Sequence, residues 1–163
     1  RERQVVTFSG DGGLAMLLSE LLTVKLHRLP IKMVVFNNSS LGMVKLEMMV
    51  AGLQEFGTDH EHVNYADIAA AIGITSIRVE DPKKLKKALQ EAFAHDGPVL
   101  VDVVTDPDAL SIPPNITWDM LMGFSRSAAK TVLDGGVGRM ADLARANLKH
   151  IGAAATVEGN RRR

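Results

Sequence analysis

A glycine-rich turn near the amino end, residues 9–14, limits the possible folds more than any other stretch. It follows residues 5–8, a run rich in β-branched and aromatic side chains that is short enough to be a buried strand. Beyond the turn leucines recur at helical spacing, so we expect a helix to begin at about Gly13. Such a turn favours anion binding, because glycines let backbone N–H groups approach a phosphate. Asp11 would repel a phosphate unless a cation lay between them.

A second apolar run, residues 31–36, is followed directly by Asn37 and Asn38. The carboxyl ends of adjacent strands in an open parallel sheet form a ligand crevice, so we expect Asp11 and Asn38 to meet there. Mg²⁺ takes few protein oxygens and completes its octahedron with water and phosphate. The sequence therefore predicts a Mg²⁺ site made by an Asp, an Asn amide oxygen, one loop carbonyl and two phosphate oxygens.

Helical and strand patterns alternate through the next part of the chain, which predicts an α/β fold with an open parallel sheet flanked by helices. Asn64 and Asp81 are expected to cap two of the helices, and Gly73 to end the first of them. The helices expected after the metal loop span residues 41–52, 65–72 and 82–95, and the strands span 75–79 and 99–104. The residues expected to face inward from the last of these helices are Leu85, Ala88, Leu89, Ala92 and Phe93.

The helix over residues 41–52 leaves the metal loop, so its first turn should face the cofactor. The residues expected on its packed face are Leu41, Val44 and Met48. We expect Lys45 and Glu47 to lie off this face. In the loop that follows, the run Asp59-His60-Glu61-His62 lacks the spacing of a metal site, which favours a solvated loop.

Length, charge and cysteine content exclude several classes of function. The 163 residues are one domain's worth of chain, enough for a sizeable core. Basic and acidic residues balance at 19 each, so no overall field recruits nucleic acid. With no cysteine, disulfides, zinc–thiolate sites and thiol nucleophiles are excluded, and a cytoplasmic setting is expected. The sequence shows no apolar run long enough to span a membrane and no signal peptide. Because the chain enters a core strand at once, we expect it to be a piece of a longer polypeptide.

After Pro107 the alternation of strand and helix patterns ends. We expect an α/β domain over residues 1–108, a helical tail over 109–152 and a disordered basic end over 153–163. Within the tail the pattern predicts an extended linker at 111–114, a helix over 118–133 that parts near Gly123, a flexible joint at 135–138 and an amphipathic helix over 139–151.

The motif Gly10-Asp11-Gly12, followed farther on by Asn37-Asn38, resembles the thiamine diphosphate motif of the superfamily of decarboxylases, oxidases and acetolactate synthases. Residues 36–42, 96–104 and 112–114, followed by Gly123-Phe124-Ser125, then resemble the C-terminal cofactor domain and tail of the bacterial pyruvate oxidases. That family implies a homotetramer that uses thiamine diphosphate, Mg²⁺ and FAD. It implies oxidative decarboxylation of pyruvate to acetate and CO₂, with electrons passed to a membrane quinone.

The resemblance also implies roles for individual residues. Asp11 and Asn38, with the carbonyl of Ser40, are expected to hold the metal. The residues expected to bind the cofactor are Gly10, Asp11, Gly12, Gly13, Asn38, Ser39, Ser40, Leu41, Gly42, Met43 and Val44. Met43 departs from the family pattern, in which a Phe stands near the path between thiamine and flavin.

Two other functions remain open from the sequence. Acetolactate synthases share the run Leu41-Gly42-Met43-Val44, but they carry an aromatic residue where this chain has Leu46-Glu47, and they need a shorter tail. Glu47 is a candidate catalytic residue that hydrogen-bonds the intermediate or relays a proton; the alternative is a surface glutamate paired with lysine. The second of these other functions is a non-catalytic assembly or regulatory module, because the main catalytic Glu of the family lies in another domain.

The tail helix admits two interpretations. Its apolar stripe beside basic residues suits either a helix packed on its own domain or one that binds an anionic membrane surface. The stripe consists of Met140, Leu143, Ala144, Asn147, Leu148 and Ile151, and the basic residues are Arg139, Arg145, Lys149 and His150. The resemblance favours release onto the membrane, which implies a cytoplasmic enzyme recruited peripherally to the inner face of the cell membrane.

Overall fold

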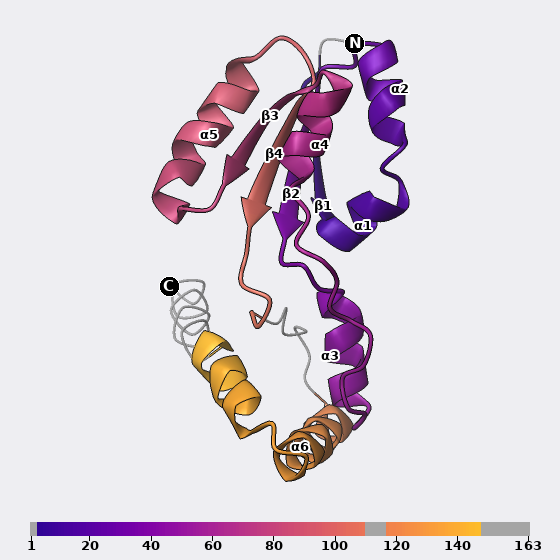
Figure 1. Ribbon diagram of the computed structural model, residues 1–163, viewed down its shortest axis with the longest axis vertical. Coiled ribbons are helices and arrows are strands. Elements are labelled where there is room, and N and C mark those ends of the chain that lie inside the picture. Colours follow the sequence, from indigo (N-terminus) through magenta and orange to yellow (C-terminus); the bar gives the residue numbers. More distant parts are fainter. Residues whose placement is uncertain (1–2, 110–116, 148–163) are drawn as a thin grey trace, which may run out of the picture. The chain divides into compact units, whose positions relative to one another are not determined.

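The computed structural model describes residues 3–109 and 117–147, and the chain forms two compact units (Figure 1). The first unit contains residues up to Ser40 together with His60–Thr105. The second contains Leu41–Asp59 together with the described residues beyond Thr105. The segment 41–59 thus interrupts the sheet-containing unit in sequence and packs with the C-terminal helices.

The first unit is built on four parallel strands in the order β1-β2-β4-β3, which confirms the predicted open parallel sheet. The strands are β1 (Val5–Gly10), β2 (Ile31–Asn37), β3 (Thr75–Val79) and β4 (Val99–Val104). Gly10 at the end of β1 lies beside Phe36 of β2. The residues that follow these two strands therefore leave the same edge of the sheet.

Four helices flank the sheet: α1 (Asp11–Met16), α2 (Glu20–Leu26), α4 (Tyr65–Ile72) and α5 (Pro82–Ala94). The predicted caps are confirmed, since the Asn64 and Asp81 side chains accept backbone N–H bonds and Gly73 adopts a φ of +83°. The single helix expected from about Gly13 is wrong. The helical segment begins at Asp11 and is interrupted after Met16. Residues 17–19 form a turn, and the second helix, α2, then buries Leu21 and Val24 in the core.

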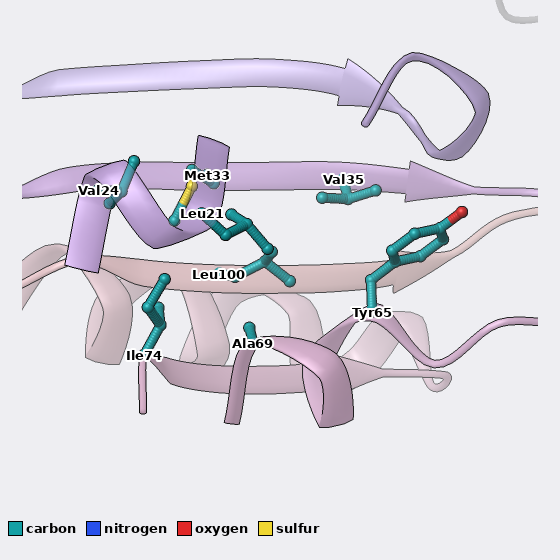
Figure 2. Packing of buried hydrophobic residues seen from close by; sticks show 8 residues of the cluster. All are labelled: Leu21, Val24, Met33, Val35, Tyr65, Ala69, Ile74 and Leu100. Carbon is teal, nitrogen blue, oxygen red and sulfur yellow. The ribbon is translucent and has the colours of Figure 1, made fainter. Parts of the chain in front are cut away.

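The core lies on both faces of the sheet. Strand side chains alternate between the faces, so neighbours in β4 enter different clusters. One cluster, shown in Figure 2, joins α2 and α4 to the sheet through Leu21, Val24, Met33, Val35, Tyr65, Ala69, Ile74 and Leu100. The other joins α5 through Val34, Val79, Ala88, Ala92, Val99, Val101 and Val103. Phe93 was expected to face inward, but it is 41% exposed, because it lies at the outer edge of α5's apolar stripe.

The second unit contains α3 (Gly42–Val50) and α6 (Trp118–Leu133), which pack against each other. A Cβ built on Gly123 would lie 1.7 Å from the Val50 carbonyl oxygen, so only glycine allows this close approach. The predicted break near Gly123 is therefore wrong: α6 is continuous, and the glycine serves helix packing.

The packed face of α3 also differs from the prediction. Leu46 and Met49 are buried, whereas Leu41 and Val44 are 40% and 45% exposed. The Lys45 side chain is buried as well, and its Nζ lies 3.5 Å from Glu55 Oε1 and 3.3 Å from Asp108 Oδ1. Two carboxylates within the same unit compensate the buried charge, which a reading of apolar periodicity does not anticipate.

A further helix runs from residue 137 to the end of the described chain at 147. Leu143 is buried on the second unit, Arg139 Nη2 lies 2.7 Å from Glu55 Oε1, and Asn147 Nδ2 donates to the Asp108 carbonyl. Gly138, predicted to lie in a joint, is already helical. The expected linker at 111–114 and basic end at 153–163 lie outside the described residues. Among those described, no helix has the length and apolar character needed to cross a membrane.

Candidate functional site

Asp11 lies at the carboxyl edge of the sheet, as the first residue of α1 directly after β1. Its side chain is 2% exposed. One carboxylate oxygen accepts the Gly12 N–H at 2.8 Å, and the other accepts the Ser39 N–H at 2.6 Å. These two bonds offset part of the desolvation cost of a buried carboxylate. They also join the glycine-rich turn to the loop that follows β2.

That loop has a specific conformation. Ser39 has a φ of +54°, a left-handed backbone that side chains rarely adopt. Asn38 Oδ1 accepts the Ser40 N–H at 3.0 Å, which holds the amide oxygen against the backbone of its own loop. Asn38 is half-buried, and Ser39 and Ser40 are buried. The structure therefore brings Asp11 and residues 38–40 together at one edge of the sheet.

A buried carboxylate behind this edge holds the two loops in place. Asp102 of β4 is fully buried and accepts three hydrogen bonds, from Asn37 Nδ2 at 3.0 Å, Tyr65 N at 3.0 Å and Arg78 Nη1 at 2.6 Å. The Tyr65 hydroxyl in turn donates to the Asp11 carbonyl at 3.3 Å. Asp102 thus supports both Asn37, the neighbour of Asn38, and the backbone of Asp11.

Electrostatics in this network keep the donors protonated. Burial, and then the negative charges of Asp11 and Asp102, raise the pKa of Tyr65 above its ordinary value of 10.0. The hydrogen bond to Glu80 is the largest cause that raises the pKa of Arg78, against the opposing effect of burial, and Asp102 adds to the rise. Sequence reasoning missed Asp102, although a lone acidic residue inside the apolar run of β4 is a usable signal.

Two histidines of the loop before α4 approach the same edge. His62 Nδ1 lies 2.7 Å from Ser39 Oγ, and His60 Nε2 lies 3.6 Å from Asp11 Oδ2. Asp59 and Glu61 are exposed, as a solvated loop predicts. The prediction is wrong for His60, because the backbone bond from His60 N to the Ser39 carbonyl brings its ring over Asp11.

The residues present fit a magnesium–diphosphate group. A Cβ built on Gly10 or Gly13 meets nothing within 4 Å, so there is space beside the Asp11 turn. The oxygen donors are one buried carboxylate and one amide, and within residues 3–109 and 117–147 no cluster of three or more His, Cys, Asp or Glu could hold a metal. A site with so few protein ligands suits Mg²⁺, which keeps water and phosphate in its coordination shell.

The remaining predicted site residues belong to the second unit. Gly42 is the first residue of α3, and Met43 on its first turn is 60% exposed. Glu47 is also exposed on this helix. The binding roles predicted for Leu41–Val44 and the catalytic role predicted for Glu47 stay predictions.

Comparison with known proteins places this geometry in a family. The thiamine pyrophosphate enzyme family, in its C-terminal TPP-binding domain, matches residues 1–103, which contain the sheet and the Asp11 edge. The chain belongs to this family. It is therefore the thiamine pyrophosphate (thiamine diphosphate) binding domain of a thiamine-dependent enzyme, with a helical tail beyond the matched residues.

Curated relatives share this domain. YdaP of Bacillus subtilis, provisionally named a thiamine pyrophosphate-containing protein, is 35% identical over 133 residues, which cover 82% of this chain and 23% of YdaP. Pyruvate oxidase of Lactiplantibacillus plantarum is 32% identical and covers 66% of this chain and 18% of its own length. Acetolactate synthase isozyme 1 large subunit of Escherichia coli is 30% identical, covering 69% and 20%. The chain spans less than a quarter of these relatives.

Proposed function

We propose that this chain is the thiamine diphosphate- and Mg²⁺-binding part of a flavin-dependent pyruvate oxidase. The observation that carries the cofactor assignment is the meeting of Asp11 with residues 38–40 at the ends of two adjacent parallel strands. Asp11, Asn38 and the Ser40 carbonyl hold the metal, and the glycine-rich turn leaves space for the diphosphate. Bound thiamine diphosphate supplies an electron sink for decarboxylation, while the protein supplies placement and electrostatics.

The tail supports an oxidase over a synthase. The family match ends at residue 103, but α6 and the helix after it continue the chain. A synthase needs less tail than this. FAD, pyruvate, the quinone and the partners of a homotetramer are then bound largely by the rest of the enzyme. Acetolactate synthase is the second candidate, because its members match at 30–34% identity, similar to the 32% of pyruvate oxidase.

Product analysis separates these two reactions. The intact protein, supplied with pyruvate, thiamine diphosphate, Mg²⁺ and FAD, is expected to form acetate and CO₂ and to reduce a soluble quinone in equal amounts. Acetolactate formed without quinone reduction would contradict the oxidase and support the synthase. If neither acetate nor acetolactate forms although thiamine diphosphate is bound, the result would favour a non-catalytic module.

We also propose that the helix from residue 137 recruits the enzyme peripherally to the inner face of the cell membrane. Met140 and Leu143 of this helix face other residues of the second unit, and Arg139 pairs with Glu55, so membrane binding requires release of these contacts. One such helix gives reversible attachment. Flotation with anionic liposomes, with and without pyruvate, tests this against a chain that ends at Gly136. Equal lipid binding by both chains would refute the proposal.

A further inference from the structure

We propose that His60 is a nitrogen ligand to the cation held at Asp11, so that the site favours later transition-metal cations such as Co²⁺ more than an all-oxygen site would. This inference rests on the proposed metal site but goes beyond it. Asp11, Asn38 and Ser40 supply oxygens only, whereas an imidazole suits transition metals better than it suits Mg²⁺.

The hydrogen bonds of the His60 ring define which nitrogen is available. Nδ1 lies 3.2 Å from the Glu61 carbonyl oxygen, which can only accept, so Nδ1 is the donor of this bond. Nε2 is then the ring nitrogen that is left to bind a metal. It is buried from solvent and has no hydrogen-bond partner; among the described residues it is the one such side-chain atom. Donation of the second ring nitrogen to a carbonyl is the usual support of a metal-bound histidine.

This nitrogen faces a carboxylate oxygen. His60 Nε2 lies 3.6 Å from Asp11 Oδ2, so a cation held by the carboxylate is within reach of the imidazole nitrogen. Two ligands that are each about 2.1 Å from one cation lie about 3.0 Å apart at a right angle and about 3.4 Å apart at the tetrahedral angle. The observed pair is therefore within a small adjustment of sharing a cation.

The position of the ring is held by the same loop that carries the predicted ligands. His60 N donates to the Ser39 carbonyl at 3.0 Å, and His62 Nδ1 lies 2.7 Å from Ser39 Oγ. Ser39 in turn donates to Asp11. These links fix residues 60–62 to the loop between Asn38 and Ser40, so the imidazole is built into the site rather than carried on a free loop.

The test is pulsed electron paramagnetic resonance of bound Mn²⁺. The intact protein is loaded with thiamine diphosphate and Mn²⁺, with natural-abundance or ¹⁵N-labelled histidine. We expect a directly bound nitrogen whose coupling changes on histidine labelling, which excludes amide and thiamine nitrogens as its source. His60→Leu should abolish this coupling and lower the Co²⁺-to-Mg²⁺ affinity ratio by about tenfold. His27→Leu, which removes an exposed imidazole at the opposite edge of the sheet, should change neither.

The outcomes separate this inference from the proposed function. Mn²⁺ that binds in an Asp11-dependent manner but shows no histidine nitrogen coupling would overturn the role of His60 and leave the metal site standing. Coupling that persists in His60→Leu would also overturn it. Mn²⁺ that binds equally well to Asp11→Ala would refute the proposed site, and the inference would fall with it. If His60→Leu does not fold, His60→Gln takes its place, and the histidine coupling should be lost from that variant while it persists in His62→Leu.

Discussion

Asp102→Ala is expected to be the most damaging single substitution behind the metal edge. Asp102 is fully buried and accepts bonds from Asn37, Tyr65 and Arg78. The three donors are not affected equally when the carboxylate is removed. Asn37 Nδ2 keeps the Val63 carbonyl at 2.8 Å, and Arg78 keeps Glu80 and is partly exposed to water. The buried N–H of Tyr65 keeps no such substitute among the bonds described here.

The magnitude follows from these differences. Leaving the Tyr65 N–H buried and unpaired costs about 1–3 kcal/mol, and the lost bond to Asn37 costs about 1 kcal/mol. The half-exposed guanidinium of Arg78 adds about 0–1 kcal/mol, because solvent replaces part of its interaction. The free energy of unfolding should therefore fall by about 2–5 kcal/mol, a range that overlaps the cost of breaking a buried ion pair.

Urea unfolding of the intact protein, followed by circular dichroism, and hydrogen exchange of α4 measure this loss. Asp96→Ala removes an exposed carboxylate just before β4 and serves as the matched control, with an expected change within about 0.5 kcal/mol. Thiamine diphosphate affinity should fall as well, since Asn37 and Tyr65 support the loops of Asn38 and Asp11. A loss below about 1 kcal/mol would refute the reasoning.

Three further predictions test other parts of the structure. Gly123→Ala should force α3 and α6 apart and cost about 1–3 kcal/mol, and an unchanged thermal midpoint would contradict the packing described. Stability should decline as the pH rises through 10.0 and on through the raised pKa of Tyr65, because the folded state retains that proton more strongly than the unfolded chain; Tyr65→Phe should flatten this decline. Glu47→Gln should lower turnover on pyruvate and shift its pH profile, and unchanged kinetics would leave Glu47 as a surface residue.

The sequence predicts the sheet well because its signals are local. Alternation of strand and helix patterns, the Asn64 and Asp81 caps and Gly73 each act within a few residues. The Asp11 turn and Asn38 could be paired in advance because adjacent parallel strands end at one edge. The break between α1 and α2 was missed because leucine spacing continues across it, and no glycine or proline marks it.

Features that depend on distant partners could not be predicted. Lys45 is buried only because Glu55 and Asp108 come to it, and periodicity assigns a lysine to the surface. His60 lies over Asp11 because of a backbone bond to Ser39, far away in sequence. Gly123 indicates a helix break when read along the chain, and only the proximity of Val50 reveals its packing role.

Calorimetric titration of thiamine diphosphate into the intact protein, with and without Mg²⁺, tests the central claim most directly. Binding should require Mg²⁺ in the wild-type protein and in the Asp96→Ala control. Loss of an outer-shell partner typically costs about 10–100-fold in metal affinity, so Asp11→Ala should weaken Mg²⁺-dependent binding by at least about a hundredfold, and Asn38→Ala should weaken it in the same direction. Unchanged affinity in both variants would contradict the assignment of the site to Asp11 and the loop after β2.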